Sequence, residues 1–148
     1  MGAGEHVLRH VAVEGIVTTM KAKILLIEDN PENRYLVAFL LEQRGHEVIP
    51  AESGPQGLEL AAKIRPDLIL LDIQLPGMDG HAVAGAIKSD PQLQHIPVVA
   101  VTSYAMVGDR EKCLAAGAEG YIEKPINPDS FVAEIERFLR APAKDGAL

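Results

Sequence analysis

Three carboxylates in this sequence directly follow short apolar runs. Glu28 and Asp29 come after the run 24–27, and Asp72 comes after the run 68–71. A carboxylate at the end of a buried strand can act as a nucleophile or as an oxygen ligand for a hard cation such as Mg²⁺. Asp72 alone could equally well cap the loop that follows it, so its role depends on the rest of the chain.

Two further polar residues follow apolar runs. Thr102 closes the run 97–101, and Lys124 follows residues 120–123. Taken singly, a strand-end threonine usually bonds to backbone and a lysine usually lies in solvent. Beside three carboxylates, a hydroxyl donor and an ammonium group could hold a phosphoryl group while a carboxylate attacks it. The carboxylates would also raise one another's pKa values, so a cation should offset them.

Five short apolar segments alternate with five segments of helical periodicity. The expected strands are residues 24–27, 46–50, 68–72, 97–102 and 120–123. This alternation is typical of βαβ units, whose strands are parallel and whose crossovers are right-handed. The sequence therefore predicts an α/β fold, a doubly wound (βα)5 three-layer sandwich around a five-stranded parallel sheet. All carboxyl ends of such strands lie on one edge, which brings the polar residues together.

Start and stop signals place the connecting helices. Asn30 and Ser53 are expected N-caps of the first two helices. The remaining helices are expected over 81–88, over 105–117 and from 127 onward. The apolar positions that define a face on the first and fourth helices are Tyr35, Leu36, Phe39, Leu40, Leu41, Leu114 and Ala115.

The composition is that of an ordinary globular chain. Of its 148 residues, 47% are hydrophobic and 24% are charged, which suffices for one domain with a buried core. The formal net charge of -7 argues against direct nucleic-acid binding, because such binding requires a basic surface. No apolar run is long enough to cross a membrane and no signal-peptide pattern is present, so a cytoplasmic protein without membrane contact is expected.

Cysteine and histidine residues give no metal-binding pattern. The single cysteine, Cys113, excludes an internal disulfide and a cysteine-based zinc cluster, and its expected role is inert packing. His46, His81 and His95 are scattered without ligand spacing and are expected at the surface.

The chain is expected to hold one domain with two short appendages. Residues 1–20 contain glycines that interrupt any apolar period, which predicts a mobile N-terminal extension. The domain is expected over 21–141, and residues 142–148 form a tail.

Four motifs in order give a specific resemblance. They are Glu28-Asp29-Asn30, the stretch 72–80, Val101-Thr102-Ser103 and Tyr121-Ile122-Glu123-Lys124-Pro125. Over about residues 21–141 the chain resembles the receiver domain of two-component response regulators, which has a flavodoxin-like fold. Because no output domain follows, the resemblance is to stand-alone receivers of the chemotaxis and cell-cycle regulator type.

The resemblance implies a phosphoacceptor site. Asp72 would accept a phosphoryl group from a sensor histidine kinase or a histidine phosphotransfer protein, and Thr102 and Lys124 would contact its oxygens. Asp29 would bind Mg²⁺ (or Mn²⁺) directly, and Glu28 mainly through water. The full set of implied metal ligands is Glu28, Asp29, Asp72 and the backbone carbonyl of Gln74.

The resemblance also implies a switch. Phosphorylation would move Thr102, Tyr121 would turn inward, and the face of the fourth helix, fifth strand and fifth helix would change for a downstream protein target. The Lys124–Pro125 bond is expected to be cis, and the protein is expected to be a monomer or a phosphorylation-dependent dimer. Gln74 and Tyr104 could control the access of hydrolytic water, and slow autodephosphorylation is expected.

Three alternatives remain open at this point. An aspartyl-nucleophile phosphohydrolase usually needs an acid two residues after the nucleophile, where this chain has Gln74. A flavin or nucleotide binder would need a phosphate loop after the first strand, where Glu28 and Asp29 would repel phosphate. A phosphorylation-independent interaction module would be signalled by a missing site residue, and none is missing.

Overall fold

The computed structural model describes residues 21–103 and 107–140 of the chain. The predicted extension 1–20 and tail 142–148 lie outside the described residues, and so does Tyr104. The predictions made for these segments therefore stay predictions.

One parallel sheet forms the middle layer of the molecule. Its strands lie in the order β2-β1-β3-β4-β5, and each neighbouring pair is parallel. The bounds are β1 (Lys23–Ile27), β2 (Glu47–Ala51), β3 (Leu68–Asp72), β4 (Val98–Thr102) and β5 (Gly120–Glu123). The predicted five-stranded parallel sheet is confirmed.

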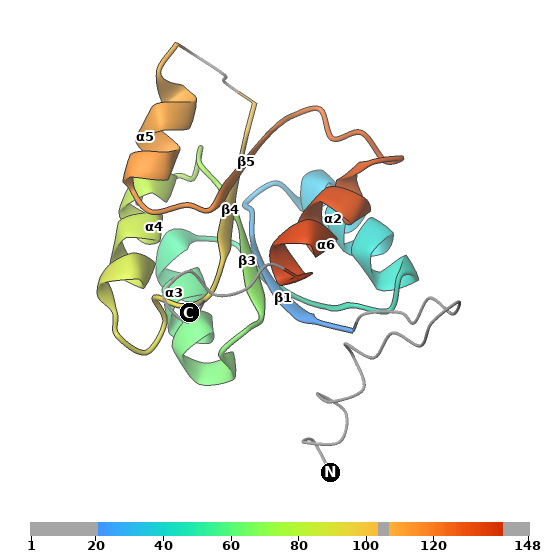
Figure 1. Cartoon of the computed structure of the whole chain (residues 1–148), viewed down its shortest axis with the longest axis horizontal. Helices are drawn as coiled ribbons and strands as arrows, with labels where there is room; N and C mark the ends of the chain where they lie inside the picture. The colour runs from blue at the N-terminus through green and yellow to red at the C-terminus, as the bar shows by residue number, and fades with distance from the viewer. Residues whose placement is uncertain (1–20, 104–106, 141–148) are drawn as a thin grey trace.

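Helices cover both faces of this sheet (Figure 1). On one face lie α2 (Pro31–Gln43) and α6 (Phe131–Arg140), and on the other lie α3 (Gly54–Ile64), α4 (Gly80–Ser89) and α5 (Asp109–Ala115). Helices on both faces and the strand order make this a doubly wound three-layer α/β sandwich, as predicted.

Two inner strands of the sheet, β3 and β4, are completely buried. All five residues of β3 and all five of β4 are buried. Each strand places alternate side chains in two separate apolar clusters, one under each helical layer. Strands that are buried on both faces have continuous apolar sequences. The bounds predicted for β3 and β4 are therefore close to the observed ones.

Side-chain caps begin three of the helices, and two of these caps are the ones predicted from the sequence. The Asn30 side chain accepts a hydrogen bond from the Asn33 N–H, and the Ser53 side chain accepts one from the Gln56 N–H. Asp79 caps α4 in the same way, with bonds to the first N–H groups of that helix.

The predicted helix 105–117 is wrong in length and in its buried face. Gly108 has a left-handed φ of 86°, and α5 begins only after it, at Asp109. Cys113 is the buried residue of α5, whereas Leu114 is exposed. The last helix also starts later than predicted, because residues 128–130 form a turn before Phe131.

The apolar face predicted for the first helix is only partly correct. Leu41 is fully buried, together with Val37, against the sheet. Tyr35 and Phe39 stand exposed instead, with their rings stacked at a centroid distance of 6.2 Å. Residues four apart share a helix face, so this pair forms its own apolar stripe away from the core.

His46 is buried rather than at the surface, which corrects the sequence expectation. Its Nδ1 accepts a hydrogen bond from the Ala22 N–H at 3.1 Å, which leaves Nε2 to donate to Glu136 at 2.8 Å. Arg44 donates to the other oxygen of the Glu136 carboxylate at 2.9 Å. The cluster joins the start of β1 to α6, and its polar atoms are satisfied within it.

Replacing His46 with alanine tests this cluster. We expect the free energy of unfolding to fall by about 2 kcal/mol, because the buried Glu136 carboxylate and the Ala22 N–H each lose a hydrogen-bond partner. Denaturant unfolding followed by circular dichroism measures the loss. His95→Ala is the control, since His95 is exposed, and it should change stability by less than about 0.5 kcal/mol. Equal effects of the two substitutions would refute a structural role for the cluster.

The strand β2 lies at one edge of the sheet. The Glu47 N–H donates to the Ala22 carbonyl and the Ala51 carbonyl accepts from the Glu28 N–H, both at 2.9 Å. The backbone N–H and C=O groups of successive residues point to opposite sides of a strand. Those of residues 48 and 50 therefore point away from β1. Residue 50 is a proline, which has no N–H to offer on that side.

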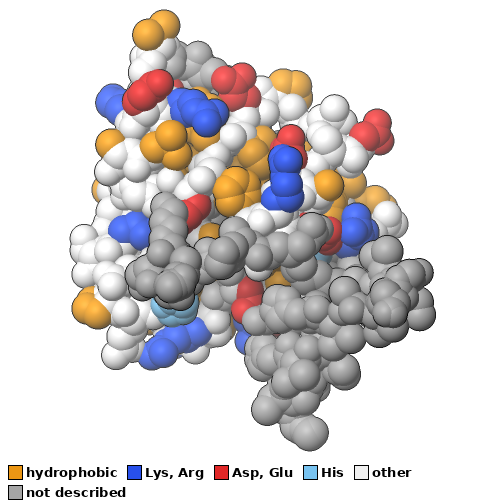
Figure 2. Space-filling model, in the orientation of Figure 1, with side chains coloured by type: hydrophobic (Ala, Val, Ile, Leu, Met, Phe, Trp, Pro, Cys, Tyr) orange, Lys and Arg blue, Asp and Glu red, His pale blue; other side chains and the backbone are white. Residues whose placement is uncertain are grey.

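The surface and the helix lengths are those of a globular domain. Acidic, basic and apolar side chains are interspersed on the face drawn in Figure 2. Within residues 21–103 and 107–140, every helix is too short or too polar to span a membrane.

Candidate functional site

Four strand ends bring the predicted site residues to one edge of the sheet. The register pairs Ile27 with Leu71, so Glu28, just after β1, and Asp72, the last residue of β3, lie at the same level. On β4, Asp72 pairs with Val101, and Thr102 is the next residue. Thr102 pairs with Glu123, the last residue of β5, and Lys124 follows directly. Segments nearly 100 residues apart in sequence therefore meet here because the strands are parallel.

The three predicted carboxylates form a cluster. One oxygen each from Glu28, Asp29 and Asp72 lie within 4.8 Å of one another. Glu28 and Asp72 are buried, and Asp29 is exposed, so the cluster opens to solvent on one side. An all-oxygen donor set with one open side fits a hard divalent cation that keeps part of its water shell.

Lys124 supplies the positive charge inside the cluster. Its Nζ lies 3.0 Å from Glu28 Oε1 and 3.7 Å from Asp72 Oδ2. Only 14% of the lysine side chain is exposed, so the ammonium group is directed inward rather than into solvent. The Lys124–Pro125 peptide bond is cis, as expected.

Backbone contacts fix the position of Glu28. The Asn30 N–H donates to Glu28 Oε2 at 3.2 Å, and the Arg34 guanidinium donates to the Glu28 carbonyl at 2.8 Å. Both contacts come from the start of α2, so the helix holds the acidic loop in place. Glu28 Oε1 is thereby left to face Lys124.

Asp72 is an unusual carboxyl group. Its pKa is raised from 3.8 to about 7, and burial is the largest cause. The Gln74 N–H, which donates to Oδ1 at 3.0 Å, lowers the pKa, the Glu28 charge raises it, and the Lys124 charge lowers it. Desolvation prevails over the two favourable contacts. A bound cation would restore the carboxylate at neutral pH.

Gln74 contributes its side chain, a contact that the sequence reasoning did not anticipate. The amide nitrogen donates to Thr102 Oγ1, and the amide oxygen accepts from the Ser103 N–H at 3.2 Å. Thr102 is fully buried, so its hydroxyl is oriented by the loop that follows Asp72. The loop and the end of β4 are thus connected beside the candidate nucleophile.

Gly80 lets this loop return against β3. A Cβ added at Gly80 would lie 2.5 Å from the Cα of Ile73 and 2.9 Å from the Asp72 carbonyl oxygen. The Gly80 N–H also donates to the Ile73 carbonyl at 3.1 Å. Only glycine permits this approach, which seats the start of α4 directly on the residues that carry the carboxyl group.

Tyr121 lies beside the site, on β5. It is half-buried against the apolar cluster of α3, α4 and α5. Its hydroxyl donates to Asp109 Oδ2 at 2.9 Å, which ties β5 to the start of α5. Burial, followed by the bond to Asp109, raises the pKa of Tyr121 to about 12, so the phenol stays neutral.

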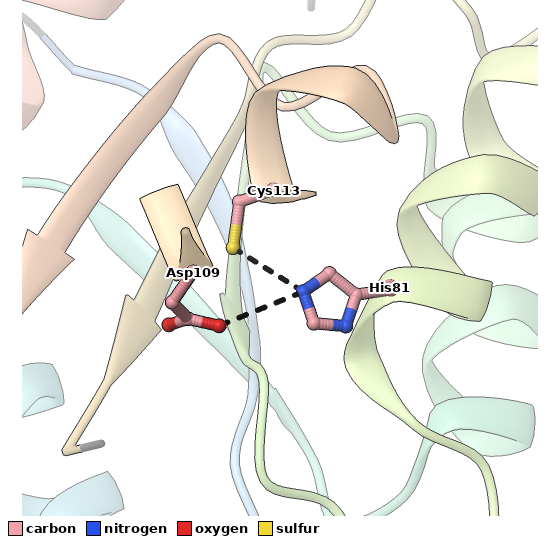
Figure 3. Close-up of side chains that lie close together, drawn as sticks. All are labelled: His81, Asp109 and Cys113. Atoms are coloured by element: carbon pink, nitrogen blue, oxygen red, sulfur yellow. Dashed lines mark hydrogen bonds and ion pairs between the residues drawn. The ribbon is translucent and has the colours of Figure 1, made fainter. Parts of the chain in front are cut away.

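A second cluster of metal-binding residue types lies between α4 and α5 (Figure 3). His81, Asp109 and Cys113 each place one candidate ligand atom within 4.8 Å of the others. No sequence spacing indicates this cluster, because His81 and Cys113 are 32 positions apart and meet only when α4 and α5 pack. Burial raises the pKa of the Cys113 thiol to about 11.

Comparison with known proteins identifies the family. Residues 24–136 match the response regulator receiver domain. The chain is 44% identical over 120 residues to the polar-differentiation response regulator DivK of Brucella anthropi, a match that covers 81% of this chain and 98% of that protein.

Solved structures agree with this result. The chemotaxis protein CheY4 of Vibrio cholerae superimposes with a TM-score of 0.75 at 30% identity, covering 79% of this chain and 98% of that one. The receiver domain of the Pseudomonas aeruginosa sensor histidine kinase PA1611, with magnesium coordinated in its active-site cleft, gives a TM-score of 0.71 at 36% identity, covering 81% and 95% of the two chains. The chain therefore belongs to the response regulator receiver domain family.

Proposed function

We propose that this signalling protein accepts a phosphoryl group on Asp72 in a Mg²⁺-dependent reaction. The observation that carries the proposal is the surrounding of Asp72: two further carboxylates lie within 4.8 Å, and the Lys124 ammonium lies 3.7 Å from Oδ2. The donor would be the phosphohistidine of a sensor histidine kinase or of a histidine phosphotransfer protein. We expect this protein to work in the cytoplasm.

In the proposed step, a carboxylate oxygen of Asp72 attacks phosphorus. The new bond joins this oxygen to phosphorus, and the bond from phosphorus to the donor histidine nitrogen breaks. Lys124 and the Thr102 hydroxyl would contact the phosphoryl oxygens as they pass between the two groups. Gln74 supports the role of Thr102, because its amide donates to Oγ1 and so orients the hydroxyl group.

The residues present fit a magnesium ion. Asp29, Glu28 and Asp72 would hold it, with the backbone carbonyl of Gln74 as a further ligand. When bound, the ion supplies positive charge that favours the Asp72 carboxylate and offsets the phosphoryl oxygens. The magnesium seen in the related Pseudomonas receiver domain supports this assignment.

Phosphorylation would then act through Thr102 and Tyr121. The aspartyl phosphate adds about -1.5 to -2 charges and three acceptor oxygens, toward which the Thr102 hydroxyl would move. Tyr121 would leave Asp109 and turn inward, which alters the face formed by α5, β5 and α6. A downstream protein that prefers the altered face would shift the equilibrium between the two states, whether the receiver is a monomer or a phosphorylation-dependent dimer.

A small phosphodonor tests the proposal directly. Purified protein incubated with acetyl phosphate and Mg²⁺ should gain one phosphoryl group by intact mass spectrometry, and chelation of Mg²⁺ should prevent the gain. Asp72→Asn should remain unmodified, whereas Asp129→Asn, which changes an exposed aspartate, should behave like the wild type. Unmodified wild-type protein would refute the proposal, and rapid multiple turnover would favour a phosphohydrolase instead.

Gln74 and Tyr104 are expected to set the lifetime of the phosphoryl group. Gln74→Ala removes the amide that covers Thr102, so we expect water to reach phosphorus more easily and dephosphorylation to accelerate by roughly tenfold, the equivalent of one net hydrogen bond. Tyr104→Ala should act in the same direction. Loss of label after removal of the donor measures both rates, and unchanged lifetimes in both variants would eliminate the idea.

A further inference from the structure

We infer that His81, Asp109 and Cys113 form a binding site for a borderline-soft divalent cation of the zinc type, separate from the acidic cluster at Asp72. His81 lies in the first turn of α4, and the other two residues lie one turn apart on α5. The side chains point toward one another across the gap between the helices (Figure 3). Nitrogen, oxygen and sulfur donors together select zinc over magnesium, which prefers oxygen alone.

The distances from His81 Nε2 to the other two donor atoms are close to those of tetrahedral zinc. Bonds of about 2.3 Å to sulfur and about 2.0 Å to nitrogen place these two atoms about 3.5 Å apart. His81 Nε2 lies 3.6 Å from Cys113 Sγ. It lies 3.9 Å from Asp109 Oδ1, where a tetrahedral site needs about 3.4 Å, so only a small shift of the carboxylate is required.

Asp79 prepares His81 for this role. Its Oδ1 lies 3.5 Å from His81 Nδ1, and it is fixed there by the backbone N–H groups of His81 and Ala82. A carboxylate beside Nδ1 favours the tautomer that carries the proton on that nitrogen. The lone pair of Nε2 is then directed at Asp109 and Cys113, the arrangement found behind many zinc-binding histidines.

The site is reachable although Cys113 is buried. His81 and Asp109 keep 26% and 14% of their side-chain surface exposed. Both line a groove of about 710 Å³ together with Gly108 and Lys112. A cation entering here would replace the thiol proton, and a water molecule would complete four ligands.

The same site connects to the proposed switch, and this step rests on the proposed function. Asp109 offers Oδ1 to the cation while Oδ2 accepts the Tyr121 hydroxyl. A bound cation would hold α5 against α4 and keep Tyr121 in its present position. Zinc should therefore oppose phosphorylation-driven switching, and by reciprocity phosphorylation should weaken zinc binding.

Cobalt(II) titration of the full chain in excess Mg²⁺ tests the site. Because Cys113 is the only cysteine, a thiolate-to-cobalt charge-transfer band reports this residue alone. We expect the band in the wild type together with the intense visible bands of tetrahedral cobalt, and we expect zinc to displace both. Cys113→Ser should abolish the band. Absence of the band from the wild type would overturn the inference.

Three further variants distinguish the residues that support metal binding from a histidine that does not. His81→Gln should weaken cobalt binding at least tenfold, and Asp79→Asn should weaken it roughly tenfold while still capping α4. His95→Gln, at an exposed histidine, should bind like the wild type. Zinc should raise the melting temperature of the wild type and of His95→Gln but not of Cys113→Ser. Wild-type affinity in His81→Gln would overturn the inference.

A final comparison tests the coupling independently. Cobalt affinity should be several-fold lower after acetyl phosphate treatment than before. Equal affinities would remove the coupling and leave the metal site established in the unphosphorylated protein. Failure of phosphorylation itself would refute the proposed function without affecting the titration of the untreated protein.

Discussion

Lys124→Met is expected to lower the free energy of unfolding of the metal-free protein by about 3 kcal/mol. The substitution keeps the length of the side chain but removes the ammonium that lies 3.0 Å from Glu28 and 3.7 Å from Asp72. Only 4% of the Glu28 side chain and 5% of the Asp72 side chain are exposed, so water cannot replace the lost charge. Thermal and denaturant unfolding in the presence of a chelator measure the effect.

A second lysine provides the control for this result. Lys63 forms an ion pair with Glu59 at 3.8 Å, but 68% of each side chain is exposed. Lys63→Met should therefore cost less than about 0.5 kcal/mol. Adding Mg²⁺ should restore the stability of Lys124→Met. It should change the stability of Lys63→Met only as much as it changes that of the wild type. Equal losses in both variants would contradict a buried charge cluster.

Asp72→Asn is expected to stabilise the metal-free protein, and increasingly so as the pH rises. The folded-state pKa of Asp72 is about 7 and its ordinary value is 3.8, so the folded protein binds this proton more tightly than the unfolded chain. Its contribution is fully present below pH 3.8 and is lost as the pH rises toward and through 7. Asparagine carries no charge at any pH and avoids that loss.

The size of the effect can be bounded. The shift of the pKa corresponds to roughly 4 kcal/mol at most, and we expect a gain of about 2 kcal/mol, because the asparagine amide is itself a buried polar group that must be desolvated. At pH 8 the melting temperature of Asp72→Asn should exceed that of the wild type by roughly 6–10 °C. Near pH 4 the two proteins should melt together.

Asp129→Asn, the exposed control, should follow the wild type at every pH. Mg²⁺ should raise the melting temperature of the wild type more than that of Asp72→Asn, because the variant lacks one carboxylate of the site. A stability difference that does not change between pH 4 and pH 8 would show that burial does not control the Asp72 carboxyl group.

Sequence reasoning located the sheet and the strand-end residues because both depend on local signals. The length and the boundaries of the run 68–71 indicate a strand buried on both faces, and parallel strands bring Glu28, Asp72, Thr102 and Lys124 to one edge. The caps at Asn30 and Ser53 were equally local.

The errors arose where tertiary packing decided the outcome. His46 was expected at the surface because its hydrogen-bond partner, Glu136, is 90 residues away in the sequence. No local pattern indicates that these two polar side chains meet inside the protein. The start of α5 depended on the backbone of Gly108, and the burial of Cys113 rather than Leu114 depended on the rotation of a two-turn helix against α4. The side chain of Gln74 reached Thr102 through a loop whose path no periodicity describes.

The proline on the outer edge of β2 affects how copies of this protein behave at high concentration. An incoming strand from another molecule needs donors and acceptors along the whole edge, and Pro50 removes a donor where β2 faces outward. At the other edge, β5 offers only four residues. Neither edge presents a long, complete template, so the open sheet can remain dispersed at high concentration without a barrel or a partner to close it.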